Sequence, residues 1–280
     1  MYLEKKVALI TGASRGLGLE IAKGFISAGI SKIFIVSRKT GDLEHAKREL
    51  IKKLVSKNQE VIAIEADLSI PSDVTGIFEG VKKSSNKLDI LINNASLFGP
   101  IGNFDSVSFE EWLETINVNY VGTARITKAL LPFLKMSRNA KIINIVGGGA
   151  SIPYGCLSGY ATSKVALIRF TEELALELRK YEIDVNALAP GPLRTRFIDK
   201  MLEAGRSVLG DKLFQAILEI DQSGGTPLSI PVTACLTLVS GRFNGLSGKM
   251  LSARYDDFED IFSRKSEIEN SDLYTLRRLT

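Results

Sequence analysis

Histidine and cysteine are scarce in this 280-residue chain, and that scarcity excludes several kinds of catalytic site. His45 is the only histidine, so neither a histidine-based nucleophilic triad nor a zinc site built from histidines can be assembled. Cys156 and Cys235 are the only cysteines, and nothing pairs them, so we expect two free thiols in a reducing cytoplasm. We predict no metal site, and proton transfer must then use tyrosine, lysine, aspartate, glutamate or cysteine.

Long apolar runs and a strong charge of one sign are missing as well. No run in the chain reaches the roughly 18 apolar residues of a membrane-spanning helix, so we expect no membrane partner. The first apolar run, residues 7–10, is too short for the apolar region of a signal peptide. The formal net charge of +4 is small and dispersed, so we expect no nucleic-acid partner.

Apolar, strand-like segments alternate with helical segments through most of the chain. Strands are predicted at residues 7–11, 32–37, 60–65, 88–92, 141–146, 183–189 and 249–253. Helical periodicity is found at residues 16–28, 42–56, 69–84, 109–135, 158–180 and 231–240, whereas residues 193–228 are predicted to be irregular and rich in loops. This alternation predicts an α/β fold of the Rossmann type, a doubly wound parallel sheet of about seven strands with helices on both faces.

One domain, residues 1–253, accounts for this pattern, and residues 254–280 form a C-terminal extension of different composition. Phe258, Ile261 and Phe262 stand at helical spacing in the extension, so we expect it to dock on a surface. Its own domain and a neighbouring subunit both remain open as that surface.

A glycine-rich loop, residues 11–18, joins the first predicted strand to the first predicted helix. Gly12 permits a sharp turn, Gly16 lets the backbone approach a phosphate, and Gly18 lets the helix pack closely on the strand. The N-terminus of the helix offers free N–H groups and the positive end of its dipole to a pyrophosphate. The loop therefore predicts a dinucleotide-binding site.

The residues after the second predicted strand favour NADP(H) over NAD(H). An NAD site usually carries a carboxylate there, but this strand ends in Ser37 and is followed by Arg38 and Lys39. Arg15 of the glycine loop is expected to face the same pocket, and guanidinium groups bind phosphate through paired hydrogen bonds. The alternative is that Arg38 and Lys39 belong to a solvated loop.

Tyr160 and Lys164 are the candidate catalytic pair. They are four residues apart on a predicted helix and therefore share one face. Free tyrosine has a pKa of about 10 and is a poor acid–base catalyst near neutrality. A nearby ammonium group and an oxidised nicotinamide would both stabilise tyrosinate and lower this pKa.

These motifs together resemble the short-chain dehydrogenase/reductase family in its compact single-domain form, over about residues 5–250. The resemblance rests on Thr11-Gly12-x-x-x-Gly16-x-Gly18, Asn93-Asn94-Ala95, Asn119, Tyr160-x-x-x-Lys164, and Pro190-Gly191 with Thr195, which occur in the family's order. It implies hydride transfer between NADP(H) and a carbonyl or secondary alcohol, with a small-molecule substrate that includes sugar derivatives among its candidates. It also implies a homodimer or homotetramer that pairs through residues 109–135 and 158–180.

The resemblance also assigns roles to individual residues. Tyr160 is the acid/base, Lys164 lowers its pKa and holds the nicotinamide ribose, and Asn119 holds a water in a proton relay. Asp67 and Leu68 are expected at the adenine. The residues expected at the cofactor are Gly12, Ser14, Arg15, Gly16, Leu17, Gly18, Ser37, Arg38, Asp67, Leu68, Asn94, Ala95, Tyr160, Lys164, Pro190, Gly191 and Thr195.

One position departs from the family pattern, because Gly147 stands where the resemblance leads us to expect a catalytic serine. Three explanations remain open. Ser151 supplies the hydroxyl from a pliable glycine segment, backbone N–H groups of that segment donate instead, or the site is weakened. In the last case the protein is a catalytically degraded NADPH-binding interaction or regulatory protein. A related epimerase or dehydratase is a third, less favoured function.

The loop after Pro190-Gly191 is expected to cover the substrate. It carries four cationic residues, Arg194, Arg196, Lys200 and Arg206. They either attract an anionic substrate, such as a phosphorylated or nucleotide-linked sugar, or form a solvated helical face, which is the favoured interpretation. Tyr154 and Phe197 are expected to line the substrate pocket.

Overall fold

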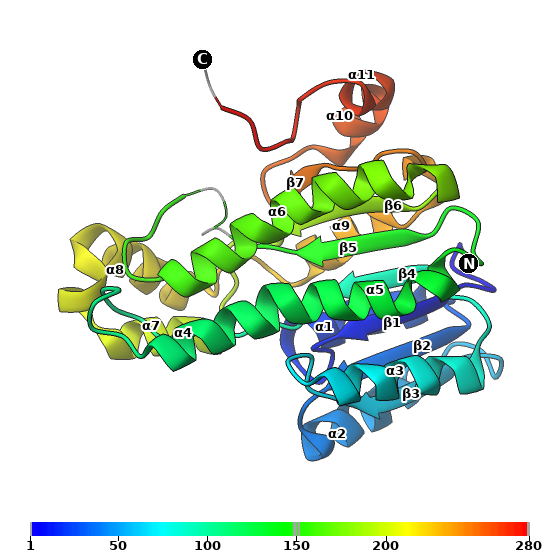
Figure 1. The fold of residues 1–280 in the computed structure, drawn as a ribbon, viewed down its shortest axis with the longest axis horizontal. Coiled ribbons are helices and arrows are strands. Elements are labelled where there is room, and N and C mark those ends of the chain that lie inside the picture. Colours follow the sequence, from blue (N-terminus) through cyan, green and yellow to red (C-terminus); the bar gives the residue numbers. More distant parts are fainter. Residues whose placement is uncertain (1, 148–149, 151, 279–280) are drawn as a thin grey trace.

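The computed structural model describes residues 2–147, 150 and 152–278, and a seven-stranded parallel sheet forms its centre (Figure 1). The strand order is β3-β2-β1-β4-β5-β6-β7, with paired strands parallel throughout. The strands are β1 Val7–Thr11, β2 Lys32–Ser37, β3 Glu60–Glu65, β4 Ile90–Asn93, β5 Lys141–Ile145, β6 Asp184–Ala189 and β7 Met250–Ser252. The predicted Rossmann-type α/β fold with seven strands is confirmed.

Helices cover both faces of the sheet. One face is covered by α1 (Gly16–Ser27), α2 (Thr40–Ile51) and α9 (Ser229–Leu238). The other is covered by α3 (Pro71–Ser84), α5 (Thr123–Leu134) and α6 (Ser158–Leu178), which lie in front of the sheet in Figure 1. No helix among the described residues is long and apolar enough to cross a bilayer.

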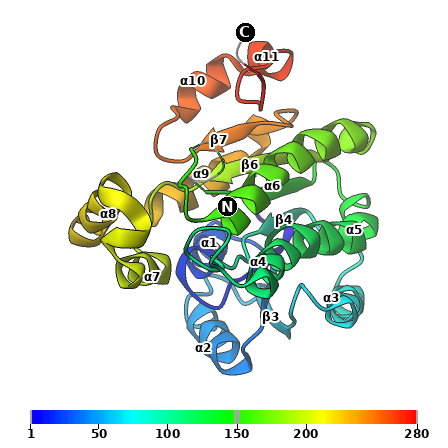
Figure 2. The ribbon, with the colours of Figure 1, turned by 60° about the vertical axis from the view of Figure 1, so that its left-hand side comes forward.

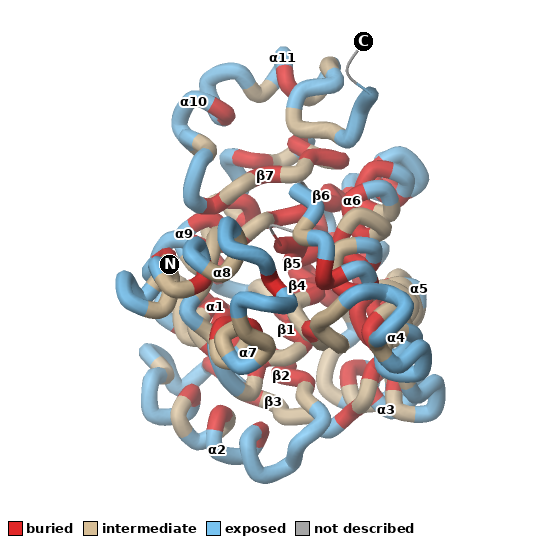
Figure 3. The backbone as a smooth tube through the Cα atoms, turned by 90° about the vertical axis from the view of Figure 1, so that its left-hand side faces the viewer, coloured by how far each residue is buried: buried red, intermediate tan, exposed pale blue. Residues whose placement is uncertain are grey.

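The apolar sequences of the strands explain why helices cover both faces of the sheet. Successive side chains of a strand point to opposite faces, so a strand buried on both sides needs apolar residues at every position. In β1, Ala8 and Ile10 pack with the helices of one face, while Val7 and Leu9 pack with those of the other. Figure 3 shows the buried strands between helices whose outer sides are exposed.

The prediction that residues 193–228 are irregular is wrong. They form α7 (Arg196–Ala204) and α8 (Arg206–Ser223), which project beyond the carboxyl ends of the strands (Figures 1 and 2). Gly205 and Gly210, with φ of +79° and +73°, interrupt the helical path and obscure its periodicity in the sequence. Leu213, Ile217 and Ile220 nevertheless recur at helical spacing and line a cavity beneath these helices.

The single helix predicted over residues 109–135 is interrupted. It consists of α4 (Phe109–Ile116), a π-helical segment η1 (Asn117–Gly122) and α5. Short π-helical segments inside α-helices are frequent at functional sites. Here the segment carries Asn119.

The C-terminal extension packs against its own chain in this structure. Its helices α10 (Phe258–Ser263) and α11 (Lys265–Glu269) bury Ile261 and Ile268 in the core beside the sheet. Beyond them, the carbonyl of Tyr274 accepts a hydrogen bond of 2.7 Å from the backbone N–H of Met250 in β7. The extension thus covers the outer edge of the sheet, at the top of Figure 1.

Candidate active site

A cavity of about 640 Å³ lies at the carboxyl ends of the strands. The strand order reverses between the adjacent strands β1 and β4, and open α/β sheets usually bind ligands at such a switch point. Figure 3 views the molecule from this side. Most of the residues predicted to be catalytic or to bind the cofactor line this cavity. They are Gly12, Ser14, Arg15, Gly16, Leu17, Ser37, Arg38, Leu68, Asn94, Ala95, Tyr160, Lys164, Pro190, Gly191 and Thr195. In the described ranges, no group of three or more His, Cys, Asp or Glu side chains is arranged to hold a metal ion.

Four of the predicted site residues do not line this cavity. Gly18 lies in the first turn of α1 and packs against the start of the glycine loop, where an added Cβ would be 2.5 Å from the carbonyl oxygen of Gly12. Asp67 and Asn119 also lie behind the lining, and both contact residues that belong to it. Ser151 lies outside the described residues.

The glycine loop forms an anion-binding cradle. Gly12 adopts φ +65°, and an added Cβ would lie only 2.8 Å from Cα of Ala95. Gly16 adopts φ +56° and has no atom within 4 Å of the position of a Cβ, so its backbone faces open space. The amide of Asn94 donates to the carbonyl oxygens of Thr11 and Gly12, at 2.9 and 3.1 Å, and fixes the turn. The first turn of α1 carries no acidic residue, which leaves the positive end of its dipole for an anion.

Two arginines stand at the end of the cavity near β2. Arg15 Nη1 is 3.7 Å from Asp42, and Arg38 Nη1 is 3.4 Å from Asp67. Partial burial raises the pKa of Asp67, but hydrogen bonds from Ser69 and the charge of Arg38 outweigh this effect and lower it overall. Both guanidinium groups are about half exposed, at 55% and 44%, so each retains donors for a phosphate.

Tyr160 and Lys164 lie in the first turns of α6, on the opposite side of the cavity. Lys164 is 2% exposed, and its Nζ donates to the carbonyl oxygen of Ile145 at 3.0 Å. The same Nζ lies 5.7 Å from the centre of the Tyr160 ring. Burial raises the pKa of the Tyr160 hydroxyl and lowers the pKa of Lys164 to about 7. Burial thus favours the neutral form of each group.

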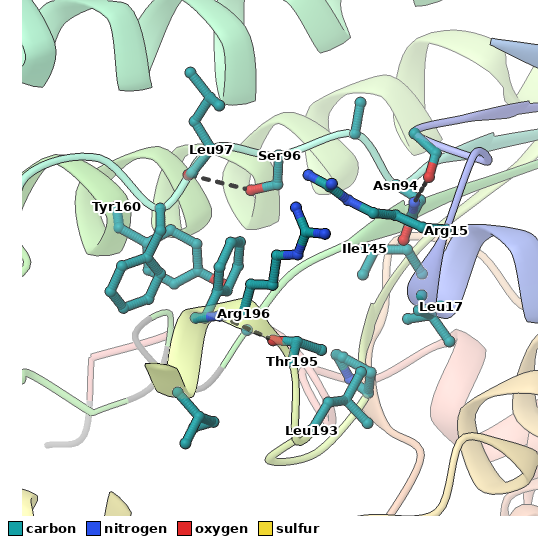
Figure 4. A pocket seen from close by; sticks show the side chains of 18 of the residues that line it. Arg15, Leu17, Asn94, Ser96, Leu97, Ile145, Tyr160, Leu193, Thr195 and Arg196 are labelled. Atoms are coloured by element: carbon teal, nitrogen blue, oxygen red, sulfur yellow. Dashed lines mark hydrogen bonds between the residues drawn. The ribbon is translucent and has the colours of Figure 1, made fainter. Parts of the chain in front are cut away.

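Aromatic packing holds the Tyr160 ring in place. The centre of the Phe98 ring lies 5.0 Å from that of Tyr160, and Phe197 lies 6.0 Å away in an edge-on arrangement. Figure 4 shows the aromatic rings gathered beside Tyr160 at one end of the pocket. Such pairs add stabilisation beyond the burial of their surface, so the position of the hydroxyl is well defined.

Gly147 lies directly against this hydroxyl. A Cβ added at Gly147 would be 2.5 Å from Oη of Tyr160 and 3.4 Å from its Cζ. A side chain at this position, including that of a serine, therefore fits only if the Tyr160 side chain or the backbone at Gly147 shifts.

Asn119 positions neighbouring segments with its side chain. Its Nδ2 donates to the carbonyl oxygen of Leu97 at 2.8 Å and to Oγ of Ser163 at 3.0 Å. Its Oδ1 accepts from the N–H of Leu97 at 2.7 Å and from Oγ of Ser96 at 3.2 Å. The side chain thereby ties the segment after β4 to α6, and a proton relay through Asn119 stays a prediction.

The far end of the cavity is apolar, and sequence reasoning missed most of it. Tyr154 and Phe197 line it as predicted. The lining residues that were missed are Phe98, Ile198, Met201, Leu213, Ala216, Ile217, Ile220 and Leu228. The spacing of Leu213, Ile217 and Ile220 was the signal that could have revealed them.

Sequence comparisons relate the chain to dehydrogenases. A family model described as short chain dehydrogenase matches residues 6–205. Short chain dehydrogenase andI of Emericella variicolor is 30% identical over 269 residues, which cover 95% of this chain and 87% of that protein. The 2,3-dihydro-2,3-dihydroxybenzoate dehydrogenase of Bacillus subtilis is 30% identical over 193 residues, or 69% of this chain and 72% of that protein.

Solved structures share the fold. The L-sorbose reductase of Gluconobacter frateurii, complexed with NADPH and L-sorbose, superimposes with a TM-score of 0.79 at 26% identity, covering 90% of this chain and 97% of that one. An NAD+-bound xylitol dehydrogenase gives a TM-score of 0.81 at 22% identity, covering 90% and 98% of the two chains. The second likeness, at this identity, concerns the fold alone.

Proposed function

The chain belongs to the short-chain dehydrogenase family, and we propose that within it the protein is an NADP(H)-dependent oxidoreductase acting on a carbonyl or secondary alcohol. The observation that carries the proposal is one cavity in which Tyr160 and Lys164 of α6 face the glycine loop and the N-terminus of α1. An acid/base pair and a dinucleotide cradle meet there, as hydride transfer to a carbonyl requires.

The residues present fit a nicotinamide dinucleotide. The glycine loop and α1 would hold the pyrophosphate, and Lys164 the nicotinamide ribose. Arg15 and Arg38 would hold the 2′-phosphate, since no carboxylate ends β2 to accept a ribose hydroxyl. When bound, the nicotinamide supplies or accepts the hydride. The structural relatives described above include one with NADPH and one with NAD+, so the proposed preference for NADP(H) rests on Arg15 and Arg38.

Tyr160 is proposed to move the proton. In the reducing direction its hydroxyl donates to the carbonyl oxygen of the substrate, and the raised pKa keeps that proton in place until then. In the oxidising direction the tyrosinate accepts a proton from the alcohol. The ammonium form of Lys164 favours the tyrosinate, because opposite charges stabilise each other strongly in a buried site.

Backbone N–H groups of the segment after β5 are proposed to polarise the substrate oxygen. The lack of space beside Gly147 supports this choice, because the Cβ of a serine there would lie 2.5 Å from Oη of Tyr160. Backbone donors do the same work in oxyanion sites of other enzymes. Ser151 stays the alternative donor.

We further propose that residues 254–280 belong to the same subunit as the domain they cover. The burial of Ile261 and Ile268 and the hydrogen bond between Met250 and Tyr274 support this assignment. A homodimer or homotetramer stays a prediction from the family resemblance.

Replacement of Tyr160 by phenylalanine tests the proposed function. The variant keeps the ring and its packing but loses the proton, so NADPH oxidation with a carbonyl substrate should fall about 10²–10⁴-fold while cofactor affinity stays unchanged. Full turnover by the variant would contradict the proposal. The wild-type protein could instead bind the cofactor and turn over none of a broad panel of carbonyl compounds. That result would favour the alternative of a catalytically degraded NADPH-binding protein.

A further inference from the structure

The substrate end of the cavity combines an apolar wall with arginine side chains from the segment after Gly191. Its wall comes from Phe98 and Phe197, whose ring centres are 4.7 Å apart, and from the apolar side chains of α7 and α8. A sugar would bring several hydroxyl groups to this wall, and buried hydroxyls without hydrogen-bond partners are costly. An aromatic or aliphatic body suits the wall better.

The four cationic residues in the segment after Pro190-Gly191 differ in their ion-pair partners. Arg194 is engaged by Asp199 and Asp221, each at 2.6 Å, and so supports the loop itself. Arg206 pairs with Asp211 at 3.1 Å on the exposed side of α8. Neither Arg206 nor Lys200 lines the cavity.

Arg196 differs from Arg194 in its ion-pair partners. Arg194 and Arg196 both line the cavity. Arg194 is paired with two aspartates, whereas no carboxylate in the described part of the chain lies within ion-pair distance of Arg196. Its guanidinium group points into the pocket from the start of α7 (Figure 4). A guanidinium group that lines a cavity without a carboxylate partner creates a positive potential there, which a bound anion relieves.

We propose that Arg196 binds an anionic group, such as a carboxylate or sulfonate, of a substrate whose body is apolar. The proposal rests on the oxidoreductase function above and narrows its substrate class. The planar guanidinium offers two parallel N–H donors to such a group, while the apolar wall accepts the rest of the molecule and Tyr160 faces its carbonyl.

Two fluorescent probes with the same aromatic body separate the charge from the apolar contact. The probes are 8-anilinonaphthalene-1-sulfonate and the neutral N-phenyl-1-naphthylamine, titrated in the presence of saturating NADPH. Arg196→Gln should weaken binding of the sulfonate about tenfold or more and leave the neutral probe within about twofold. Lys200→Gln is the matched control, because it removes a cation from the same helix outside the cavity, and it should change neither affinity.

Other outcomes would overturn the assignment. Equal losses for both probes would show that Arg196 contributes packing only, and an unchanged sulfonate affinity would show that it binds no substrate anion. A loss of NADPH affinity with an unchanged ratio between the probes would assign Arg196 to a cofactor phosphate. Failure of the wild-type protein to bind NADPH or NADH would instead contradict the proposed function, so the two failures are distinguishable.

Discussion

Filling the space beside Gly147 should damage catalysis even when the added side chain carries a hydroxyl. A Cβ at this position would lie 2.5 Å from Oη of Tyr160, whereas ordinary van der Waals contact begins at 3.4 Å. The hydroxyl and the backbone at position 147 must therefore separate by roughly 1 Å, and a misplacement of about 1 Å at a catalytic group can cost about 10²-fold in rate. The ring cannot swing freely, because Phe98 and Phe197 pack against it.

We therefore expect Gly147→Ala and Gly147→Ser to lower kcat/KM by about 10²-fold each, measured as NADPH oxidation with a carbonyl substrate. Overpacking should also lower the free energy of unfolding by about 1–3 kcal/mol. Gly76→Ala is the matched control, since Gly76 lies in α3 with nothing within 4 Å of an added Cβ, and it should leave activity unchanged.

The serine variant decides between two accounts of this position. If the site merely lacked the hydroxyl that the resemblance leads us to expect, Gly147→Ser would raise activity while Gly147→Ala lowered it. Higher activity of Gly147→Ser than of wild type would refute the steric reasoning and restore a serine-dependent mechanism.

Two further predictions concern buried charges. The pKa of Lys164 is about 7 in the folded protein and near 10.5 when unfolded, so the unfolded state binds more protons between these values and stability rises with pH there. Chemical denaturation should thus show that Lys164→Met raises the free energy of unfolding above that of wild type most at pH 6 and progressively less toward pH 9. A difference in free energy that stays constant with pH would contradict the lowered pKa of Lys164. Asp89→Ala should cost about 2–3 kcal/mol without changing cofactor affinity, because Asp89 is 1% exposed and accepts from Val7 N–H, Lys6 and Lys87. An unfolding midpoint equal to that of wild type would show that these contacts contribute nothing.

Much of the fold was predictable because the sheet is parallel and covered on both faces. Both sets of alternating positions must then be apolar, as Val7 to Ile10 are in β1, and such runs stand out between amphipathic helices. The glycine loop was predictable for a similar reason. Its positive φ angles at Gly12 and Gly16 leave few residue types suited to those positions.

The helices over the cavity were harder to predict. Gly205 separates α7 from α8 and Gly210 breaks the helical path of α8, so the apolar periodicity is divided into short stretches. The contact between Gly147 and Tyr160 joins positions 13 residues apart through tertiary packing, which no local pattern encodes. Likewise Arg194 and Arg196 look equivalent in the sequence. Only the ion pairs of Arg194, which the structure reveals, distinguish its role from that of Arg196.

The expectation for Asn119 illustrates the same limit. Its place in the family motif predicts a residue at the site, but its side chain is fully engaged by Leu97, Ser96 and Ser163. Asn119 lies in the π-helical turn η1, and helical periodicity in the sequence cannot reveal such a turn.

A side-by-side fluorescence titration of the purified protein with NADPH and NADH tests whether it is an NADP(H)-dependent oxidoreductase. NADPH should bind at least about tenfold more tightly than NADH, since a charge-assisted pair of guanidinium and phosphate groups contributes about 1.5–3 kcal/mol. Arg38→Gln should reduce that preference and leave NADH binding unchanged. Equal affinities for the two cofactors would contradict the assignment of Arg15 and Arg38, and binding of neither would contradict the oxidoreductase itself.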